Sequence, residues 1–453
     1  MSVKTTPPTP PRLVDTDAHL DPDRPDPEEL HDVDQLRELQ FARLTWTIRH
    51  AYDNVPMYRA KYDAAGVHPD DLRELEDLAK FPFTDKSDLR GAYPFGSFAV
   101  PMADVRRVHA SSGTTGLPTV VGYTEGDLRT WAGIVARCLR LSGVHAGDLV
   151  QISYGYGLFT GGLGAHYGAE RLGCTVVPMS GGQTEKQIQL IEDFKPRVIM
   201  CTPTYLLAVM DQMRKEGLDP AATALKIGVL GAEPWTSQMR RELEDGFDIT
   251  ASDIYGLSEV MGPGVAGESA ETRDGLHIWE DHFLPEIIDP FADDKVLPDG
   301  REGELVFTSL TKVAMPVIRY RTHDLTRLLP GTARPGHRRI GRLTGRSDDM
   351  IILRGVNLFP TQIEEIALTL PALSPHFQLE LTRPHRMDEL TIHIERRPDA
   401  SDDAAAAAAR ELQHLVKSRI GSSAQVTVTD PGALPRSMGK LRRIYDNRHL
   451  SDD

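Results

Sequence analysis

The sequence predicts an α/β protein, with a large N-terminal domain of parallel sheet layers and helices followed by a small α+β C-terminal domain. Apolar runs alternate with segments of helical length between residues 149 and 254, as in βαβ units. The pattern changes after about residue 347, where alternating strands and two helices follow. The length of 453 residues exceeds what one compact domain of typical size needs.

Residues 1–37 are predicted to form an acidic, proline-rich N-terminal tail. They hold seven prolines among many aspartates and glutamates. A stretch of this composition buries little apolar surface, so we expect disorder or an extended wrap. A helix is predicted over about residues 34–52, where leucine and isoleucine recur at helical spacing.

Residues 38–347 are predicted to form the large domain. Its buried strands are expected at residues 149–153, 174–179, 197–201, 226–230 and 248–254. The helices between them are expected at residues 184–193, 203–215 and 237–245. This order of elements indicates a mostly parallel sheet that is covered by helices.

Residues 348–453 are predicted to form the separate C-terminal domain. Helices are expected at residues 360–370 and 402–420, and the second keeps apolar side chains on one face until Gly421 ends it. Strands are expected at residues 376–381, 390–395 and 425–429.

Composition argues against several classes of function. The 51 lysines and arginines against 66 aspartates and glutamates give a formal net charge of −15, which argues against a nucleic-acid partner. No apolar run is long enough to cross a bilayer, and the N-terminus lacks the apolar core of a signal peptide. We therefore expect no membrane partner and a cytoplasmic location.

The three cysteines do not form a disulfide or metal-binding pattern. Cys138, Cys174 and Cys201 are not in CxxC or CxC spacing. Each falls in a predicted helix or strand, so we expect small buried core residues.

The most informative stretch is Ser111-Ser112-Gly113-Thr114-Thr115-Gly116, which Leu117 and Pro118 follow. Its hydroxyls and backbone N–H groups suit phosphate oxygens, and no bulky side chain obstructs them. It is not a Walker A loop, because GxxxxGK[ST] is absent. Taken alone, such a hexamer is equally well explained as a surface turn.

With the proline after it, this stretch resembles the phosphate-binding loop of adenylate-forming enzymes, which include acyl-CoA synthetases, peptide-synthetase adenylation domains and luciferases. Four further segments resemble motifs of that superfamily in the same order. They are residues 255–259 (YGLSE), 320–324 (YRTHD), 345–349 (GRSDD) and 435–440 (PRSMGK). Five ordered motifs are far more specific than any one of them.

Longer stretches are similar to the phenylacetate-CoA ligase family, and the resemblance covers roughly residues 35–450. They lie at residues 154–173, 179–187, 231–235, 255–268, 275–289 and 345–364. The resemblance implies a mobile C-terminal domain and a two-step reaction: ATP and an aryl acid give an acyl adenylate, which CoA converts to a thioester. It also implies Mg²⁺, and dimers are common among similar ligases.

The same resemblance implies catalytic roles for Lys440 and Glu259. Lys440 is expected to bridge the carboxylate and the α-phosphate, because the barrier to joining two anions is largely electrostatic. Glu259 is expected to hold Mg²⁺ against the phosphates. The alternatives are a solvated loop lysine and a carboxylate at a helix start.

The nucleotide is expected to contact residues of several motifs. Asp324 is expected to accept hydrogen bonds from the ribose hydroxyls, and the alternative is a salt bridge to Arg319 or Arg321. Arg346 is expected to reach the ribose or a phosphate. The remaining nucleotide contacts are expected from Gly231, Ala232, Glu233, Tyr255, Gly256 and Ser258.

The acid pocket is expected around Tyr154, Tyr156, Phe159 and Gly161, with further glycines at positions 162 and 164. Aromatic side chains beside glycines make a flat slot that suits a planar ring. The alternative is ordinary core packing.

Two residues near the C-terminal domain are expected to serve its movement and the second step. Asp348 is the expected hinge pivot. Gly355 is expected to line the CoA channel, where a Cβ would obstruct the pantetheine arm. A simple turn is the alternative for each.

The chain departs from its relatives at two places. Leu117 and Thr119 stand where many similar enzymes carry a phosphate-loop lysine, so Mg²⁺, hydroxyls and backbone donors must neutralise the pyrophosphate. Related ligases also carry a Cys-x-Cys pair where this chain has residues 267–269 (GES). Without thiolates, we expect no zinc and structural roles for His277 and His282.

The sequence therefore predicts an ATP-dependent aryl-carboxylate–CoA ligase that produces AMP. One alternative is an aryl-acid adenylating enzyme that passes the acyl group to a carrier protein in trans or to an amine. A non-enzymatic nucleotide-binding regulator is another, but every expected catalytic position is filled. The aryl acid and the oligomeric state, including a homodimer, stay open.

Overall fold

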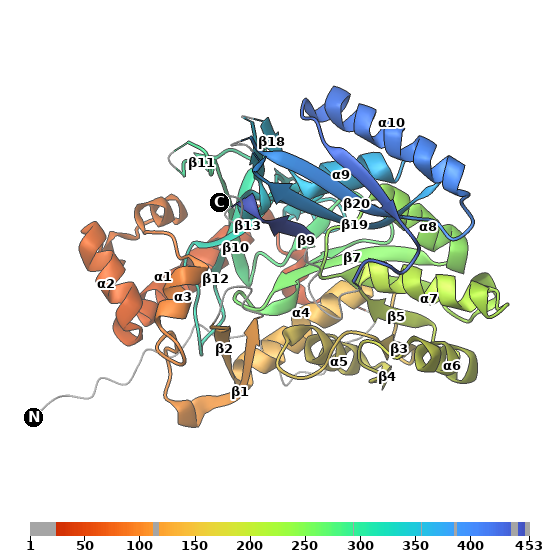
Figure 1. Cartoon of the computed structure of the whole chain (residues 1–453). Coiled ribbons are helices and arrows are strands. Elements are labelled where there is room, and N and C mark those ends of the chain that lie inside the picture. Colours follow the sequence, from red (N-terminus) through yellow and green to blue (C-terminus); the bar gives the residue numbers. More distant parts are fainter. Residues whose placement is uncertain are drawn as a thin grey trace, which may run out of the picture. The chain divides into compact units, whose positions relative to one another are not determined.

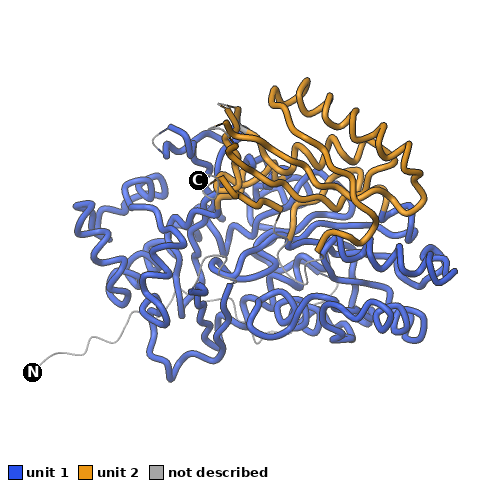
Figure 2. Tube along the Cα trace, viewed as in Figure 1, with its two compact units in different colours: residues 1–232, 243–322, 326–342 blue, residues 233–242, 323–325, 343–453 orange. Residues whose placement is uncertain are grey.

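The computed structural model of the chain describes residues 24–111, 117–292, 294–354, 356–384, 387–435 and 443–448. The chain divides into two compact units, which Figure 2 shows in blue and orange. The first unit holds residues 1–232, 243–322 and 326–342, and the second holds residues 233–242, 323–325 and 343–453. The mixed α/β class predicted from the sequence is confirmed.

A nine-stranded sheet runs through the first unit (Figure 1), in the order β14-β15-β9-β8-β7-β6-β5-β3-β4. Its parallel strands, all predicted, are β3 (Leu149–Ile152), β4 (Thr175–Val177), β5 (Val198–Cys201), β6 (Ile227–Gly231) and β7 (Thr250–Leu257). The antiparallel strands, which were not predicted, are β8 (Gly262–Glu268), β9 (Leu276–Ile278), β14 (Leu328–Leu329) and β15 (Arg339–Ile340).

Helices alternate with the parallel strands. Helices α6 (Thr184–Phe194), α7 (Pro203–Lys215) and α8 (Ser237–Phe247) agree with the predicted segments, and α4 (Glu125–Leu141) and α5 (Thr160–Leu172) precede them. The start of α7 has a clear cause, because the Thr202 side chain accepts a hydrogen bond from the Tyr205 N–H and Pro203 takes the first helical position. The three cysteines are free and buried, which confirms their core role.

The chain also forms a hairpin and a second sheet. Strands β1 (Val105–Ser111) and β2 (Thr119–Thr124) pair with Ser111 opposite Thr119. The second sheet has the order β11-β10-β12-β13-β16. Its strands are β10 (Phe283–Ile288), β11 (Val296–Leu297), β12 (Gly303–Ser309), β13 (Tyr320–Thr326) and β16 (Gly345–Arg346).

The N-terminal helices are α1 (Val33–Asn54), α2 (Pro56–Ala65) and α3 (Lys86–Gly91). Helix α1 begins inside the predicted tail because the Asp32 carboxylate accepts a hydrogen bond from the Gln35 N–H. Short 3₁₀ turns lie at Pro27–Leu30, Pro69–Asp71, Leu75–Lys80, Met102–Asp104, Pro220–Ala222 and Ser347–Asp349. Among the described helices, none is long and apolar enough to span a membrane.

The second unit contains a four-stranded sheet in the order β21-β20-β19-β22 and the helices α9 (Pro360–Ala367) and α10 (Asp402–Ile420). The strands are β19 (Leu373–Thr382), β20 (Glu389–Arg396), β21 (Gln425–Thr429) and β22 (Ile444–Asp446), with a hairpin of β17 (Ile351–Leu353) and β18 (Val356–Leu358) before them. Leu379, Ile392 and Leu412 are among the side chains of its core. Glu242 joins this unit through a bidentate ion pair with Arg397.

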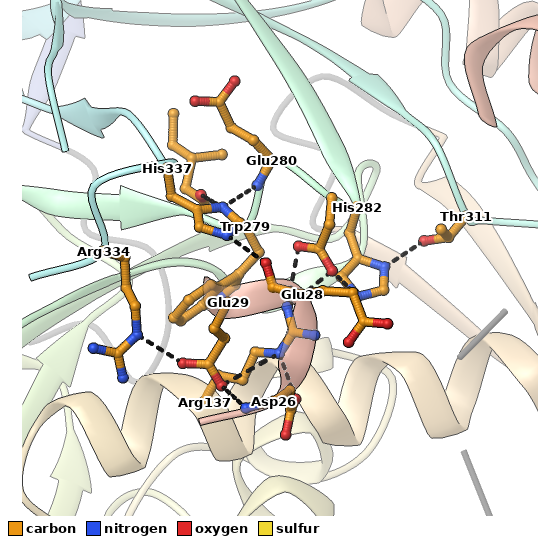
Figure 3. Close-up of polar contacts among 12 residues, drawn as sticks. Asp26, Glu28, Glu29, Arg137, Trp279, Glu280, His282, Thr311, Arg334 and His337 are labelled. Atoms are coloured by element: carbon orange, nitrogen blue, oxygen red, sulfur yellow. Dashed lines mark hydrogen bonds and ion pairs between the residues drawn. The ribbon is translucent and has the colours of Figure 1, made fainter. Parts of the chain in front are cut away.

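A buried ion cluster links the start of the described chain to helix α4 and to residues near position 281 (Figure 3). Arg137 on α4 lies at its centre: its Nε donates to the Asp26 carboxylate at 2.6 Å, and its Nη1 donates to both Asp281 oxygens at 3.0 Å. Glu29, which is 1% exposed, pairs with Arg140 and with Arg334. Asp26 and Glu29 in the predicted tail are therefore held by ion pairs with arginines.

We expect the substitution Asp281→Asn to destabilise the fold strongly. The pKa of Asp281 lies well below its ordinary value, because Arg137 and its other cationic neighbours overcome the opposing effect of burial. Removing this partner leaves the buried Arg137 without the carboxylate that its Nη1 binds, a loss of about 3–5 kcal/mol in unfolding free energy. Urea unfolding measures the change. The matched control is Asp248→Asn, which removes an exposed pair with Lys226 and should leave the transition in place.

Candidate active site

The phosphate-loop motif lies between the two strands of the β1–β2 hairpin. Ser111 ends β1, and Thr119 opposite it begins β2. Because the hairpin fixes both ends of the loop, Ser111 has a defined position. Its neighbours in the motif, Ser112, Gly113, Thr114, Thr115 and Gly116, lie outside the described residues.

The structure brings Ser111 and Glu259 together. Glu259 follows β7, its side chain is 6% exposed, and its Oε1 accepts a hydrogen bond from the Ser111 hydroxyl at 2.9 Å. Two oxygen groups from distant parts of the sequence therefore converge at the phosphate-loop end of the hairpin. A carboxylate and a hydroxyl are hard oxygen donors of the kind that Mg²⁺ binds.

Lys86 at the start of α3 reaches the same carboxylate. Its Nζ lies 3.3 Å from Glu259 Oε1, and its side chain is 34% exposed. Nothing in the sequence marks this lysine, because a single lysine in a short helix belongs to no recognisable pattern. The structure thus supplies a cation near the loop that lacks its own lysine at Leu117.

The turn that carries Glu259 is held by buried groups. Lys312 Nζ donates to the Glu259 carbonyl oxygen at 2.9 Å, and the Tyr123 hydroxyl donates to the Met261 carbonyl oxygen at 2.7 Å. The Ser258 and Thr160 hydroxyls are hydrogen-bonded at 2.9 Å. Burial lowers the pKa of Lys312 to about 8, an effect that Asp127 and Glu259 oppose.

Several of the predicted nucleotide-binding residues lie on adjacent strands. Gly231 ends β6 and pairs with Ile254 of β7, next to Tyr255, which is 8% exposed. Gly256 has no room for a side chain, since a Cβ there would lie 1.9 Å from the Gly262 carbonyl oxygen. Glycine therefore allows the backbone segments on either side of the Glu259 turn to approach closely.

Ala232 and Glu233 follow this strand end on different units. Ala232 has a φ of +71°, a conformation that non-glycine residues adopt rarely. It closes a segment of the first unit, whereas Glu233 begins a segment of the second. The boundary between the two units therefore falls between these two predicted nucleotide-binding residues.

The predicted ribose and hinge residues form one ion cluster within the second unit. Asp324 pairs with Arg346 across β13 and β16, and Arg346 Nη1 donates to Asp324 Oδ1 at 3.0 Å. Arg346 also donates to both oxygens of Asp348, at 2.8 and 2.9 Å. The pKa of Arg346 is raised because these carboxylates outweigh the effect of burial.

Arg319 and Arg321 were the alternative salt-bridge partners expected for Asp324, but each forms an ion pair with a different carboxylate. Arg319 donates to Glu286, and Arg321 donates to Glu304 in a bidentate pair. Both arginines thus support the second sheet through carboxylates other than Asp324.

The predicted acid slot lies at the start of α5. Gly161 lies against Tyr154, with 3.7 Å between its ideal Cβ position and the Tyr154 Cβ. Phe159 precedes the helix and is 50% exposed. The Tyr156 hydroxyl lies 3.2 Å from His166 Nδ1, at hydrogen-bond distance. The structure thus places one aromatic ring at the glycines and a second at the exposed start of the helix.

Glycine at position 164 has a packing reason. A Cβ there would lie 2.5 Å from the indole ring of Trp131, which stacks on Tyr123 with a ring separation of 5.0 Å. Helix α5 therefore packs closely on the pair of aromatic rings formed by Trp131 and Tyr123.

His277 and His282 make hydrogen bonds to protein groups. The Thr332 N–H donates to His277 Nε2 at 3.3 Å, and the Thr311 hydroxyl and His282 Nδ1 are 2.8 Å apart. Within the described residues, no group of three or more His, Cys, Asp or Glu side chains has the arrangement of a metal site. Two further predicted residues, Gly355 and Lys440, lie outside the described part of the chain.

Comparisons with known proteins agree on one family. The AMP-binding enzyme family matches residues 53–313, and the AMP-binding enzyme C-terminal domain matches residues 355–448. A phenylacetate-coenzyme A ligase of Aromatoleum evansii is 63% identical over 428 residues, which are 93% of this chain and 97% of that protein. The phenylacetate-coenzyme A ligase of Escherichia coli (strain K12) is 58% identical over 429 residues, 94% of this chain and 98% of that protein.

A solved structure has a similar fold over most of the chain. A 2-hydroxyisobutyryl-CoA ligase in the postadenylation state, in complex with 2-HIB-AMP, has a TM-score of 0.86 at 28% identity. The match covers 93% of this chain and 92% of that chain.

We expect the fold to lose stability as the pH falls below about 6.5, partly through His277. Burial, with Arg339 nearby, lowers the pKa of His277 to about 4, so the folded state keeps this ring neutral while the unfolded chain takes up a proton. The unfolded state is then favoured by about 1.4 kcal/mol per pH unit between pH 6.5 and 4. Urea unfolding at pH 7, 6 and 5 measures the slope.

The variant His277→Gln cannot take up this proton and should show the shallower slope. His145 is exposed, and His145→Gln provides the matched control that should keep the wild-type slope. Equal slopes in all three proteins would contradict the assignment of a neutral His277.

Proposed function

Because the chain belongs to the AMP-binding enzyme family and, within it, to the phenylacetate-CoA ligases, we propose that it activates phenylacetate or a closely similar monocyclic aryl acid. The chain is an adenylate-forming acid–thiol ligase that uses ATP and CoA. The single observation that carries the choice of acid is the sequence identity of 58–63% with phenylacetate-CoA ligases over nearly the full length of the chain. The aromatic and glycine residues at the start of α5 support a flat binding site.

The first half-reaction joins the acid carboxylate to the α-phosphorus of ATP and releases pyrophosphate. Both reactants are anions, so groups that offset negative charge lower the barrier. We propose that Ser111 donates to a phosphate oxygen and that Lys86 neutralises charge on the outer phosphates. Their convergence on Glu259 Oε1 supports both roles.

We propose Glu259 as the protein ligand of Mg²⁺. Its carboxylate has a hydroxyl donor beside it and is nearly buried, a donor set that fits a hard divalent cation. When bound, Mg²⁺ would supply charge stabilisation to the phosphates. We propose no zinc, since His277 and His282 have hydrogen-bond partners in the protein.

The remaining expected residues are proposed to act at the nucleotide and in the second step. Asp324 is proposed to accept hydrogen bonds from ribose hydroxyls beside the hydrogen bond that it accepts from Arg346. Lys440 is proposed as the bridging cation of adenylation, Asp348 as the hinge pivot, and Gly355 as part of the CoA channel. Their motifs support these roles.

The acceptor of the acyl group is proposed to be CoA itself. The thiolate of CoA displaces AMP from the acyl adenylate, and the mixed anhydride supplies the activation. A carrier protein in trans and a homodimeric assembly remain separate proposals, which omission of CoA and a sedimentation measurement test.

We expect the enzyme to prefer phenylacetate to octanoate. A slot formed by Tyr154, Phe159 and Gly161 suits a planar ring, so kcat/KM for phenylacetate should exceed that for octanoate by about tenfold or more. Acid-dependent pyrophosphate release with ATP, with and without CoA, measures both acids and benzoate. A preference for octanoate would contradict the aryl slot, and no release with any acid would contradict the ligase function.

We expect Lys86→Met to lower kcat/KM for ATP in acid-dependent pyrophosphate exchange by about 10²-fold, because the outer phosphates lose a cation. The second substitution Leu117→Lys should restore much of this loss by returning a lysine to the phosphate loop. The matched control is Lys61→Met, since Lys61 pairs with Asp88 and has a comparable 26% exposed side chain. An unchanged Lys86→Met enzyme would remove Lys86 from the site.

A further inference from the structure

The turn between β7 and β8 has two buried supports of different chemical kinds. The Tyr123 hydroxyl holds the Met261 carbonyl with a neutral hydrogen bond, whereas the Lys312 ammonium holds the Glu259 carbonyl. The first carbonyl lies two residues after Glu259, the proposed Mg²⁺ ligand, and the second belongs to Glu259 itself. The second support brings a positive charge directly behind Glu259.

Lys312 is enclosed by protein. Lys312 is 0% exposed, and its Nζ lies 5.1 Å from the centre of the Tyr123 ring. Removing an ammonium from water is costly unless nearby charges and dipoles offset the loss. Methionine would fill a similar volume without that cost. A lysine at this position therefore calls for an explanation at the group that it faces.

The segment that carries Lys312 is held on both sides. The Thr311 hydroxyl is hydrogen-bonded to His282 Nδ1, as Figure 3 shows. On the other side, the Val313 and Ala314 N–H groups donate to the Asp127 carboxylate at 2.7 and 3.0 Å. Asp127 is itself 0% exposed. The ammonium is therefore a fixed charge and not a mobile one.

We propose that Lys312 is a positioning residue for adenylation: its buried ammonium fixes the backbone of Glu259 and places a positive charge behind the side of the turn that faces the triphosphate. This inference rests on the proposed function, in which Glu259 and Ser111 face ATP. Lys312 does not touch the substrates. It acts through Glu259, and it differs from Lys86, which lies at the carboxylate and is partly exposed.

The proposal distinguishes the two substrates of the first step. The triphosphate carries most of the negative charge and depends on Glu259, whereas the aryl acid binds at the start of α5. Loss of Lys312 should therefore weaken the binding of MgATP selectively. A lysine that only filled space in the core would, when replaced, affect both substrates through a general loss of stability.

The test compares Lys312→Met with Lys312→Arg in acid-dependent pyrophosphate exchange. Lys312→Met should raise KM for MgATP by about tenfold or more while KM for phenylacetate changes by less than about twofold. Lys312→Arg keeps the charge and the donors and should recover most of the MgATP affinity. Calorimetric titration with MgATP alone gives the same comparison without turnover.

Tyr123→Phe provides the matched comparison, because it removes the neutral support of the same turn and leaves the charge. It should raise KM for MgATP by clearly less than Lys312→Met does. Lys312→Gln, which keeps a hydrogen-bond donor without the charge, replaces Lys312→Met if the methionine variant does not fold, and it should show the same selective loss.

The outcomes separate this inference from the proposed function. If the wild-type protein catalyses no acid-dependent exchange, the proposed function fails. If the wild-type enzyme is active, equal changes in both KM values, unchanged MgATP binding in a folded neutral variant, or an equal effect of Tyr123→Phe would overturn the role of Lys312.

Discussion

The placement of one carboxylate organises the polar contacts at the end of the β1–β2 hairpin. Glu259 lies beside Ser111 and is almost excluded from water, so the short turn that carries it needs firm support. Lys312 and Tyr123 hold its carbonyl groups from two different parts of the chain. The close approach of Gly256 to Gly262 and the packing of Trp131 beneath the turn follow from the same requirement.

Buried charge also explains why the first described residues are ordered. The acidic, proline-rich composition indicates a tail, yet Asp26 and Glu29 are buried against Arg137, Arg140 and Arg334. Such pairs fix the position of this segment, because its two carboxylates share a set of arginines from other parts of the chain. The cost of removing these ions from water is offset only when the whole set is present.

The sequence predicted the elements with strong periodicity and missed those without it. The parallel strands and α7, α10 and β21 agree with the predicted ranges because apolar runs, alternation or a helical apolar face mark them in the sequence. Strands β14, β15 and β16 have two residues each and are defined by their partners, so no local pattern marks them. The segment 233–242, which belongs to the second unit, is likewise set by a distant contact between Glu242 and Arg397.

The same distinction holds at the site. Ser111 and Glu259 belong to recognisable motifs, and the structure brings them into contact. Lys86 and Lys312 are single lysines in unremarkable sequence, and only the fold places them at the carboxyl and carbonyl groups of the same residue. In the proposed function, the phosphate loop carries Leu117 in place of a lysine, so the nearby positive charge comes from Lys86 and Lys312. Charge that the fold already holds in place needs little reorganisation when an anion binds, which is the condition under which electrostatic stabilisation is most effective.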